Sequence, residues 1–276
     1  MVAGELMLSR LSRAIAVASF AAIAAVPAAV ADPAFEIIRP AVFGARPILD
    51  GHGLISIKVA NRPEDIRAVP FDVATAFTDG RTVKAVTLII DNNPSPVAAA
   101  FKFGPGRDHV GLGIKFRLNQ QSDVRAVVEA SDGKLYMVTQ LVKFPGGQAA
   151  CSAPPSTPAD QIAANMGKMK LAEVALPGAS ASAATPRLRL DLAHPNHTGM
   201  VLDQITLLYT PLKMIEHIAV RQGEETVFDM EGSIALNENP TIEFDYARNG
   251  ATQMTVTAAD TDGATFEHSF PIGPSS

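Results

Sequence analysis

Apolar and polar residues alternate in short stretches along most of the chain after residue 53. In the first half, the segments with this pattern are 54–59, 69–77, 83–90, 97–103, 110–118, 124–130 and 135–144. A period of two is typical of strands that bury one face. Turn sequences separate the segments, as at Asp91-Asn92-Asn93-Pro94 and Ser131-Asp132-Gly133. Seven strands at this spacing predict a β-sandwich.

The same alternation returns after Thr185 and continues almost to the end of the chain. It is clearest at 188–192, 242–246 and 254–258, where apolar residues occupy every second position. Turn dipeptides stand at 222–223, 249–250 and 262–263. We therefore expect a second all-β domain of about 90 residues, within the usual range of domain sizes.

The stretch 145–184 between these regions is rich in glycine, proline and small residues, which is typical of a linker. One short helix is predicted inside it. Thr157 can cap the helix and Pro158 suits its first position. Ile162, Met166 and Met169 form a stripe at helical spacing. We expect this helix to pack on one of the domains.

The first 31 residues have the pattern of a secretory signal peptide. Arg10 and Arg13 precede an apolar run over 14–26, and Ala29-Val30-Ala31 is a small-x-small cleavage pattern. The run is shorter than the roughly 20 residues that span a bilayer, and no later segment reaches that length. We expect export from the cytoplasm and a mature chain that begins near Asp32 without a membrane span.

These patterns predict an all-β fold in which two β-sandwich domains are joined by a linker with a short helix. The expected divisions are a signal peptide over 1–31, a first sandwich over 32–144, a cysteine-bearing arm with helix and linker over 145–184, and a second sandwich over 185–276.

The composition fits a globular protein and excludes several classes of function. Of the 276 residues, 47% are hydrophobic and 18% are charged, which excludes a disordered chain. The net charge of −5 argues against a nucleic-acid partner. A single cysteine excludes an internal disulfide and a cysteine-rich metal site.

Cys151 is the strongest candidate for chemistry. Gly146 and Gly147 precede it, small residues flank it, and Pro154-Pro155 follow. We expect an accessible, functional thiol on a mobile arm rather than an inert core thiol, because exposure controls thiol reactivity. No lysine or arginine lies between residues 144 and 167, so activation would come from a partner. An odd thiol outside the cytoplasm also allows a Cys151-linked dimer.

Two other polar motifs predict turns rather than metal sites. His194-Pro195-Asn196-His197 has loose spacing and no third ligand nearby, so a turn at a strand end is expected. Asp260-Thr261-Asp262-Gly263 lacks the later ligands of a calcium loop and is expected to be a hairpin turn. No catalytic constellation, metal site or cofactor motif is evident in the sequence.

Several stretches of the first domain match a known pattern. They are Ile57-Lys58-Val59-Ala60 with Val69-Pro70, Asp91-Asn92-Asn93-Pro94 before Ala100-Phe101-Lys102-Phe103, Arg117-Leu118, Val124-Arg125-Ala126-Val127 and Ser131-Asp132-Gly133-Lys134-Leu135-Tyr136-Met137, followed by glycines and a cysteine. In these stretches the domain resembles SoxY, the sulfur-carrying subunit of the bacterial thiosulfate-oxidising Sox system.

The second domain resembles SoxZ. Its matching stretches are His194-Pro195 with Thr198-Gly199, Asn239-Pro240 before Ile242-Glu243-Phe244, and Asp260-Thr261-Asp262-Gly263 with Phe266. In this order the two domains are similar to the fused SoxYZ-like carriers found beside quinoprotein dehydrogenases.

The resemblance implies two immunoglobulin-like sandwiches in the periplasm, with Cys151 as the attachment point for sulfur intermediates. In the Sox family a haem enzyme conjugates thiosulfate to this cysteine and a hydrolase then releases sulfate, while the carrier itself catalyses nothing. The arm departs from the SoxY pattern, because it is internal and lacks the glycine pair after the cysteine. The resemblance therefore implies a carrier role more directly than thiosulfate as the cargo.

Three functions follow from these observations and remain open at this point. The first is a covalent sulfur carrier for Sox-type haem and hydrolase enzymes or for a quinoprotein dehydrogenase system. The second is a non-carrier accessory module that docks a quinoprotein dehydrogenase or its cytochrome, with Cys151 incidental. The third, a thiol-dependent enzyme, is disfavoured because the sequence shows no base near Cys151.

Overall fold

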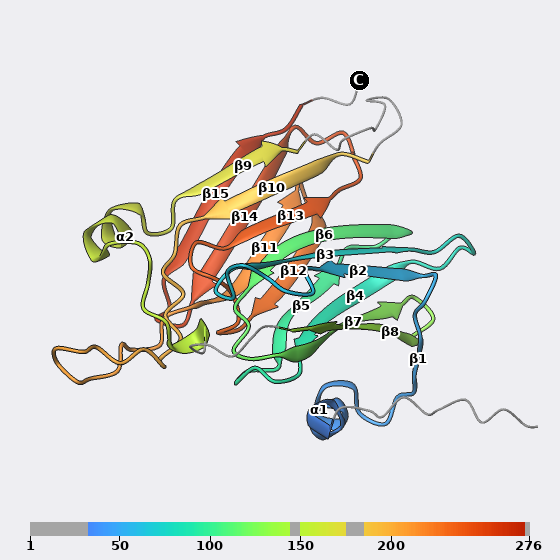
Figure 1. Ribbon diagram of the computed structural model, residues 1–276. Coiled ribbons are helices and arrows are strands. Elements are labelled where there is room, and N and C mark those ends of the chain that lie inside the picture. The colour runs from blue at the N-terminus through green and yellow to red at the C-terminus, as the bar shows by residue number, and fades with distance from the viewer. Residues whose placement is uncertain (1–32, 144–149, 175–184, 274–276) are drawn as a thin grey trace, which may run out of the picture. The chain divides into compact units, whose positions relative to one another are not determined.

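A computed structural model describes residues 33–143, 150–174 and 185–273 of the chain (Figure 1). The expected signal peptide over 1–31 lies outside these described residues, as do Gly146 and Gly147 and the stretch 175–184. No helix in the described ranges is long and apolar enough to cross a bilayer. The described part after residue 31 belongs to one compact unit.

Strands dominate the described residues, which confirms the all-β class. The first half contains α1 (Pro33–Phe43), β1 (Ile48–Asp50), β2 (Ile55–Val59), β3 (Val69–Ala76), β4 (Val83–Ile90), β5 (Val97–Phe103), β6 (His109–Phe116), β7 (Ser122–Ala130) and β8 (Leu135–Val142). Next come a short 3-10 helix η1 (Ala150–Ser152) and α2 (Ala159–Asn165). The second half contains β9 (Met169–Glu173), β10 (Arg187–Leu192), β11 (Ile215–Gln222), β12 (Glu225–Gly232), β13 (Thr241–Asp245), β14 (Gln253–Asp260) and β15 (Thr265–Pro271).

The two halves share both of their sheets. One sheet has nine strands in the order β1-β8-β7-β4-β5-β12-β11-β14-β15, and the other has six in the order β2-β3-β6-β13-β10-β9. The halves meet where β5 pairs antiparallel with β12 and where β6 pairs antiparallel with β13 (Figure 1). We call these two strand junctions the seam. Pairing across the seam removes four sheet edges that would otherwise be free to pair with other chains.

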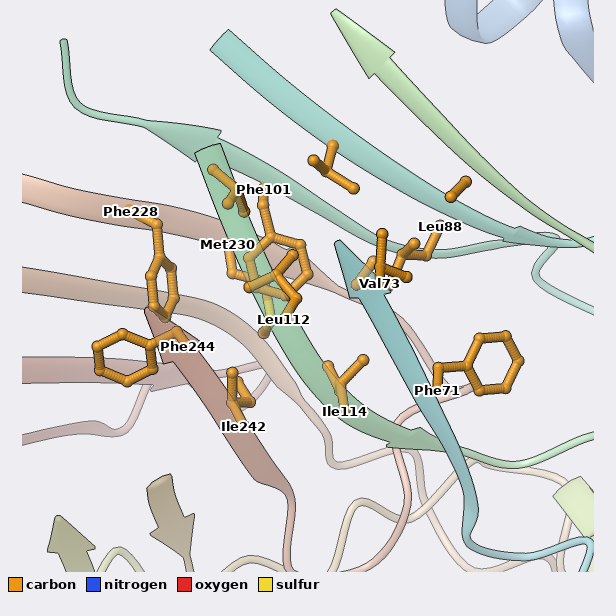
Figure 2. Packing of buried hydrophobic residues seen from close by; sticks show 14 of the residues in the cluster. Phe71, Val73, Leu88, Phe101, Leu112, Ile114, Phe228, Met230, Ile242 and Phe244 are labelled. Carbon is orange, nitrogen blue, oxygen red and sulfur yellow. The ribbon is translucent and has the colours of Figure 1, made fainter. Parts of the chain in front are cut away.

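The hydrophobic core is continuous across the seam. Phe101 of β5 contacts Phe228 of β12 with ring centroids 5.5 Å apart, and Phe228 contacts Phe244 of β13 at 5.1 Å. Figure 2 shows these rings together with Leu112 of β6 and Met230, between strands of both sheets. Burying large aromatic side chains contributes strongly to stability, so the core ties the two halves into one folding unit.

A partly buried charge cluster also crosses the seam. Arg187 of β10 forms ion pairs with Asp245 of β13 at 3.4 Å and with Asp72 of β3 at 3.6 Å. Two glycines of β6 make room for it. A Cβ atom at Gly111 would overlap the Asp245 carboxylate, and one at Gly113 would lie 3.0 Å from Arg187 Nη2. A larger residue at Gly111 would displace the Asp245 carboxylate, and one at Gly113 would require a small shift of the guanidinium that reaches across β6.

Helix α1 covers the second face of the nine-stranded sheet, and the sequence patterns did not predict it. Phe35 and Phe43 of α1 pack on Ile89 of β4, Val127 of β7 and Leu135 of β8 in a second apolar cluster. This cover explains why Ile89 and its neighbours on β4 are buried on both faces of the sheet, which breaks the alternation there.

The predicted short helix is present, but its extent and packing were wrong. α2 covers only 159–165, has no buried residue, and receives no side-chain cap. Thr157 instead donates its backbone N–H to Glu238. Gly167 adopts a φ of 75°, which ends the helical region, and a Cβ there would overlap the Phe266 ring.

The predicted stripe breaks at Met169, which opens β9 rather than extending the helix. β9 pairs antiparallel with β10, for example Leu171 opposite Leu190. The linker prediction therefore missed an edge strand of the six-stranded sheet. The alternation in this short strand is weak, since none of its five residues is fully buried.

Candidate functional site: a cysteine seated at the seam

The structure buries Cys151, which corrects the expectation of an accessible thiol. The residue lies in η1 and its side chain has no exposed surface. Ala150 beside it is buried as well, at 1% exposure. The small residues that suggested exposure therefore allow close packing instead. While Cys151 is seated in this way, its sulfur is out of reach of a second chain, so a Cys151-linked dimer requires η1 to leave this position.

Both halves of the chain hold the backbone of Cys151. Its N–H donates to Asn119 Oδ1 at 3.2 Å, from the loop between β6 and β7. Its carbonyl oxygen accepts a hydrogen bond from Thr198 Oγ1 at 2.5 Å, from the loop after β10. The cysteine thus sits at the seam, in a position that neither half could form alone. We call this arrangement the seat.

A chain of buried polar contacts positions Asn119. Asn93 Oδ1 accepts from the Asn119 N–H at 2.8 Å, and Asn93 Nδ2 donates to the Arg117 carbonyl at 2.8 Å. The Arg117 guanidinium in turn donates to the carbonyl oxygens of Ile234 and Leu236 in the second half. Because buried polar groups are costly when unpaired, this network favours a single arrangement of the seat.

Glu238 fixes the chain after the cysteine. Its Oε2 accepts from the N–H and hydroxyl of Ser156 at 2.8 and 2.9 Å, and its Oε1 accepts from the Thr157 N–H at 3.0 Å. Burial raises the pKa of Glu238, but the hydrogen bonds from Thr157 and Ser156 outweigh that effect and leave the pKa below its usual value. Glu238 therefore accepts these hydrogen bonds as a carboxylate at neutral pH.

The seated thiol is protonated at neutral pH. Burial raises the pKa of Cys151 to about 11, and the positive charge of Arg117 only partly opposes this. At pH 7 about one seated thiol in ten thousand is then a thiolate, which is the nucleophilic form. Burial and protonation both keep the seated cysteine unreactive. The local chain holds no basic residue beside the cysteine, as the sequence showed, but the fold brings Arg117 close.

A small cavity of about 90 Å³ lies beside the seat. Ala150 and Ala153 line it on either side of the cysteine, together with Arg117 and Asn237. Asn237 is 7% exposed, and its Oδ1 has no hydrogen-bond partner among the described residues. Since a single water needs roughly 10–15 Å³ of such space, the cavity has room for a group of a few non-hydrogen atoms.

His194 is held by two polar side chains in the segment that leads to Thr198. Its Nδ1 lies 2.9 Å from Asn196 Oδ1, and its Nε2 lies 3.4 Å from Asp260 Oδ2. Burial lowers the pKa of His194, so the ring is neutral at pH 7. The motif follows the end of β10 as an irregular segment without an assigned turn, forms an isolated bridge between His197 and Lys213, and leads into Thr198. No group of three or more metal-ligating side chains gathers within the described ranges.

The predicted hairpin turn at residues 260–263 is confirmed. Asp260 Oδ1 accepts from the Asp262 and Ala264 N–H groups, and Gly263 has a φ of 82° in the hairpin between β14 and β15. Sequence reasoning therefore predicted the hairpin turn after β14, while the functional role of Cys151 stays a prediction. It missed Asn119, Arg117, Thr198 and Glu238, which reach Cys151 only through the fold.

Comparisons with known proteins agree with the order of the two halves. Residues 39–149 match the family described as sulfur oxidation protein SoxY, and residues 174–271 match the family described as sulphur oxidation protein SoxZ. Cys151 lies two residues beyond the first match, and Thr198 and Glu238 lie within the second. No match was found among curated proteins.

Two solved structures are similar over parts of the chain. The sulfur carrier protein SoxY from Chlorobium limicola f thiosulfatophilum is 27% identical, covering 41% of this chain and 97% of that one, with a TM-score of 0.34. A superoxide reductase (neelaredoxin) from Ignicoccus hospitalis is 11% identical, covering 33% of this chain and 80% of that one, with a TM-score of 0.27.

Proposed function

This chain is a SoxY domain fused to a SoxZ domain, and from this premise we propose that it is a covalent sulfur carrier which holds sulfur intermediates on Cys151. The observation that carries the proposal is the position of the only cysteine of the chain. It lies at the end of the SoxY-type half, and residues of the SoxZ-type half complete its seat.

The geometry supports storage rather than catalysis. Among the described residues Cys151 accepts and donates hydrogen bonds only through its backbone, to a hydroxyl and an amide, and the nearby Arg117 lowers the thiol pKa less than burial raises it. Nucleophilic catalysis by a thiol needs a nearby activating group. The adjacent cavity gives room for a small group near the cysteine. We therefore propose a carrier that is non-catalytic by itself and depends on partner enzymes.

The simplest loading chemistry is oxidative. A Cys151 thiolate and thiosulfate form an S–S bond, Cys–S⁻ + S₂O₃²⁻ → Cys–S–S–SO₃⁻ + 2 e⁻, and the two electrons pass to a haem enzyme. Hydrolysis then releases sulfate, Cys–S–S–SO₃⁻ + H₂O → Cys–S–S⁻ + SO₄²⁻ + 2 H⁺, and a persulfide stays on the carrier. The thiolate forms readily only outside the seat, where the pKa of a thiol is near 8.5.

The proposed carrier function includes a compartment and a set of partner enzymes. We propose that the chain acts in the periplasm after removal of residues 1–31. Sox-type haem and hydrolase enzymes, or the enzymes of a quinoprotein dehydrogenase system, load and unload Cys151. The persulfide is a labile species, and a closed seat protects it between these encounters.

Intact-mass spectrometry of the chain from its native host tests the proposal. Cells supplied with thiosulfate are expected to yield an adduct of one or more sulfur atoms, with or without a sulfonate, that maps to Cys151 and disappears on phosphine reduction. The Cys151→Ser variant is the control and should carry none. An unmodified thiol under every sulfur-feeding condition contradicts the carrier role and favours the accessory module that docks a dehydrogenase.

A further inference from the structure

The loop over residues 202–212 exposes large apolar side chains to an unusual degree. Nine large apolar residues are exposed in the described part of the chain, and six of them belong to this loop: Leu202, Ile205, Leu207, Leu208, Tyr209 and Leu212. Ile205 is 92% exposed and Leu207 is 69% exposed. The loop protrudes at the lower left of Figure 1, in orange. Contiguous apolar patches on a protein surface mark interaction sites.

Backbone hydrogen bonds fix the conformation of residues 203–208 at the end of the loop. Asp203 Oδ1 accepts from the N–H groups of Ile205 and Thr206 at 2.9 and 2.8 Å, and the Asp203 N–H donates to the Leu208 carbonyl at 2.9 Å. Leu207 has a φ of 57°, in the left-handed region that favours glycine or asparagine. A bulky residue that is both strained and exposed stabilises nothing in the folded chain, which points to a role in recognition.

The base of the loop is continuous with the seat. Ser152, Pro154 and Pro155, just after the cysteine, line a groove of about 850 Å³ whose opposite wall is Met200–Gln204 with Tyr209 and Thr210. Thr198, four residues before Leu202, donates the hydrogen bond to the Cys151 carbonyl. A group that fills this groove therefore touches the turn that buries the thiol.

We propose that the 202–212 loop and this groove form the docking surface for the partner enzymes that load and unload Cys151, and that these partners present an uncharged apolar recess beside their active-site opening. The inference rests on the proposed carrier function. Asp203 is the only charged residue between 200 and 212, and its carboxylate accepts backbone hydrogen bonds within the loop, so charge contributes little to the contact.

The size of the surface favours a transient partner over a permanent one. The loop has eleven residues, whereas a stable interface of standard size uses about 20–30 residues on each side. A carrier that visits several enzymes requires such a weak and short-lived contact. Docking against Ser152, Pro154 and Pro155 also couples recognition to opening of the seat, because a partner that prefers the open turn shifts the population toward it.

Loading of Cys151 in cells tests the docking surface. The double variant Ile205→Asp with Leu208→Asp is compared with wild type and with Ile37→Asp, which changes an apolar residue of α1 that is 78% exposed. After thiosulfate is supplied, intact mass follows the adduct over time. We expect the double variant to load at least about tenfold more slowly, as for loss of interface anchors, and Ile37→Asp to load like wild type.

Chemical loading provides the control for folding and for the thiol itself. Tetrathionate converts Cys–SH to Cys–S–S–SO₃⁻ and releases thiosulfate and a proton, without any partner. The purified double variant should react with it as fast as wild type, and its melting temperature should be unchanged. The milder variant Ile205→Ser with Leu208→Ser should slow loading in cells in the same direction.

Three outcomes overturn the proposal. Equal loading of the double variant and wild type in cells shows that the loop does not dock partners. Dimerisation in sedimentation velocity, or binding to vesicles of phosphatidylethanolamine and phosphatidylglycerol, that the double variant abolishes assigns the surface to a second copy or to lipid. Absence of an adduct from wild type as well refutes the carrier function, and the docking role fails with it; this result is distinct from equal loading.

Discussion

The turn around Cys151 and the loop over 202–212 distribute their side chains in opposite ways. The turn is made of small residues and buries Ala150 and Cys151, although its composition suggested an exposed linker. The loop carries large apolar residues and is exposed, although such residues usually lie in a core. The difference shows that composition alone does not decide burial: the cysteine is enclosed between the two halves, while a group of large apolar side chains nearby is left exposed.

The pH dependence of thiol reactivity gives the largest expected effect. The folded thiol has a raised pKa of about 11, so the free energy of seating is fully present below the pKa of an open thiol and declines as pH rises toward 11. Between pH 7 and pH 10 the reaction with a disulfide reagent should accelerate about a thousandfold in the folded chain, since the thiolate population rises tenfold per unit.

The urea-unfolded chain is the control for this profile. Its thiol has an ordinary pKa near 8.5, so its rate should rise only about thirtyfold over the same range and level off above pH 9. If the reaction rate of the folded chain also levelled off above pH 9, the pKa of its thiol would not be raised, and the seat would not hold a neutral thiol.

Removal of the Glu238 carboxylate should open the seat. Glu238→Ala leaves the N–H groups of Ser156 and Thr157 without their acceptor. These donors are exposed or half-buried, so each lost hydrogen bond costs about 0.5–1.5 kcal/mol, and Cys151 should react roughly tenfold faster at pH 7. Glu224→Ala, in the exposed turn between β11 and β12, is the matched control and should leave the rate unchanged. Equal rates of thiol reaction for the two variants would show that Glu238 does not keep Cys151 in its buried position.

A smaller effect is expected from the hydroxyl that holds the cysteine carbonyl. Thr198→Val keeps the shape of the side chain and removes the hydrogen bond to Cys151. Loss of about 0.5–1.5 kcal/mol predicts a two- to tenfold faster thiol reaction. Thr87→Val on β4 is the comparison, and reagent kinetics at pH 7 measure both. A slower reaction of Thr198→Val would show that the hydroxyl stabilises the open conformation of the turn rather than the buried one.

The smallest effect concerns the strained tip of the loop. Leu207→Gly relieves a left-handed conformation that costs about 1–2 kcal/mol for a non-glycine residue, and part of this gain is offset by the greater entropy of glycine in the unfolded chain. Net stabilisation of about 0.5 kcal/mol should raise Tm by about 1–2 °C. Calorimetry should therefore record a higher Tm for Leu207→Gly. Intact mass should show that the same variant acquires its adduct more slowly in cells. A lower Tm would mean that Leu207 supports the fold.

Local patterns predicted the strands well because most strands bury one face. β3 shows this most clearly, with Val69, Phe71, Val73 and Thr75 all buried and the residues between them exposed. The sequence does contain a pattern for helix α1, because apolar residues at 35, 38 and 42 have helical spacing after Pro33. Strand pairing across the seam left no local signal, because it depends on residues more than 100 positions apart, such as Phe101 opposite Met230.

The site was predicted only in part for the same reason. A lone cysteine among small residues identified Cys151, but its burial depends on Asn119, Thr198 and Glu238, which lie 32, 47 and about 80 positions away from the groups they hold. Loop composition alone does not distinguish an arm in solvent from an arm packed in a seam. Functional segments are where local rules and the fold disagree.

The most direct test of the account compares the reaction of Cys151 with a small disulfide reagent in the folded chain and in urea, at pH 7. The account predicts that the folded thiol reacts at least a hundredfold more slowly, since its thiolate population alone is about that much smaller when the pKa is about 11 rather than near 8.5. Folded and unfolded rates within about threefold of each other would show that Cys151 is open to solvent, and the seat would not exist in solution.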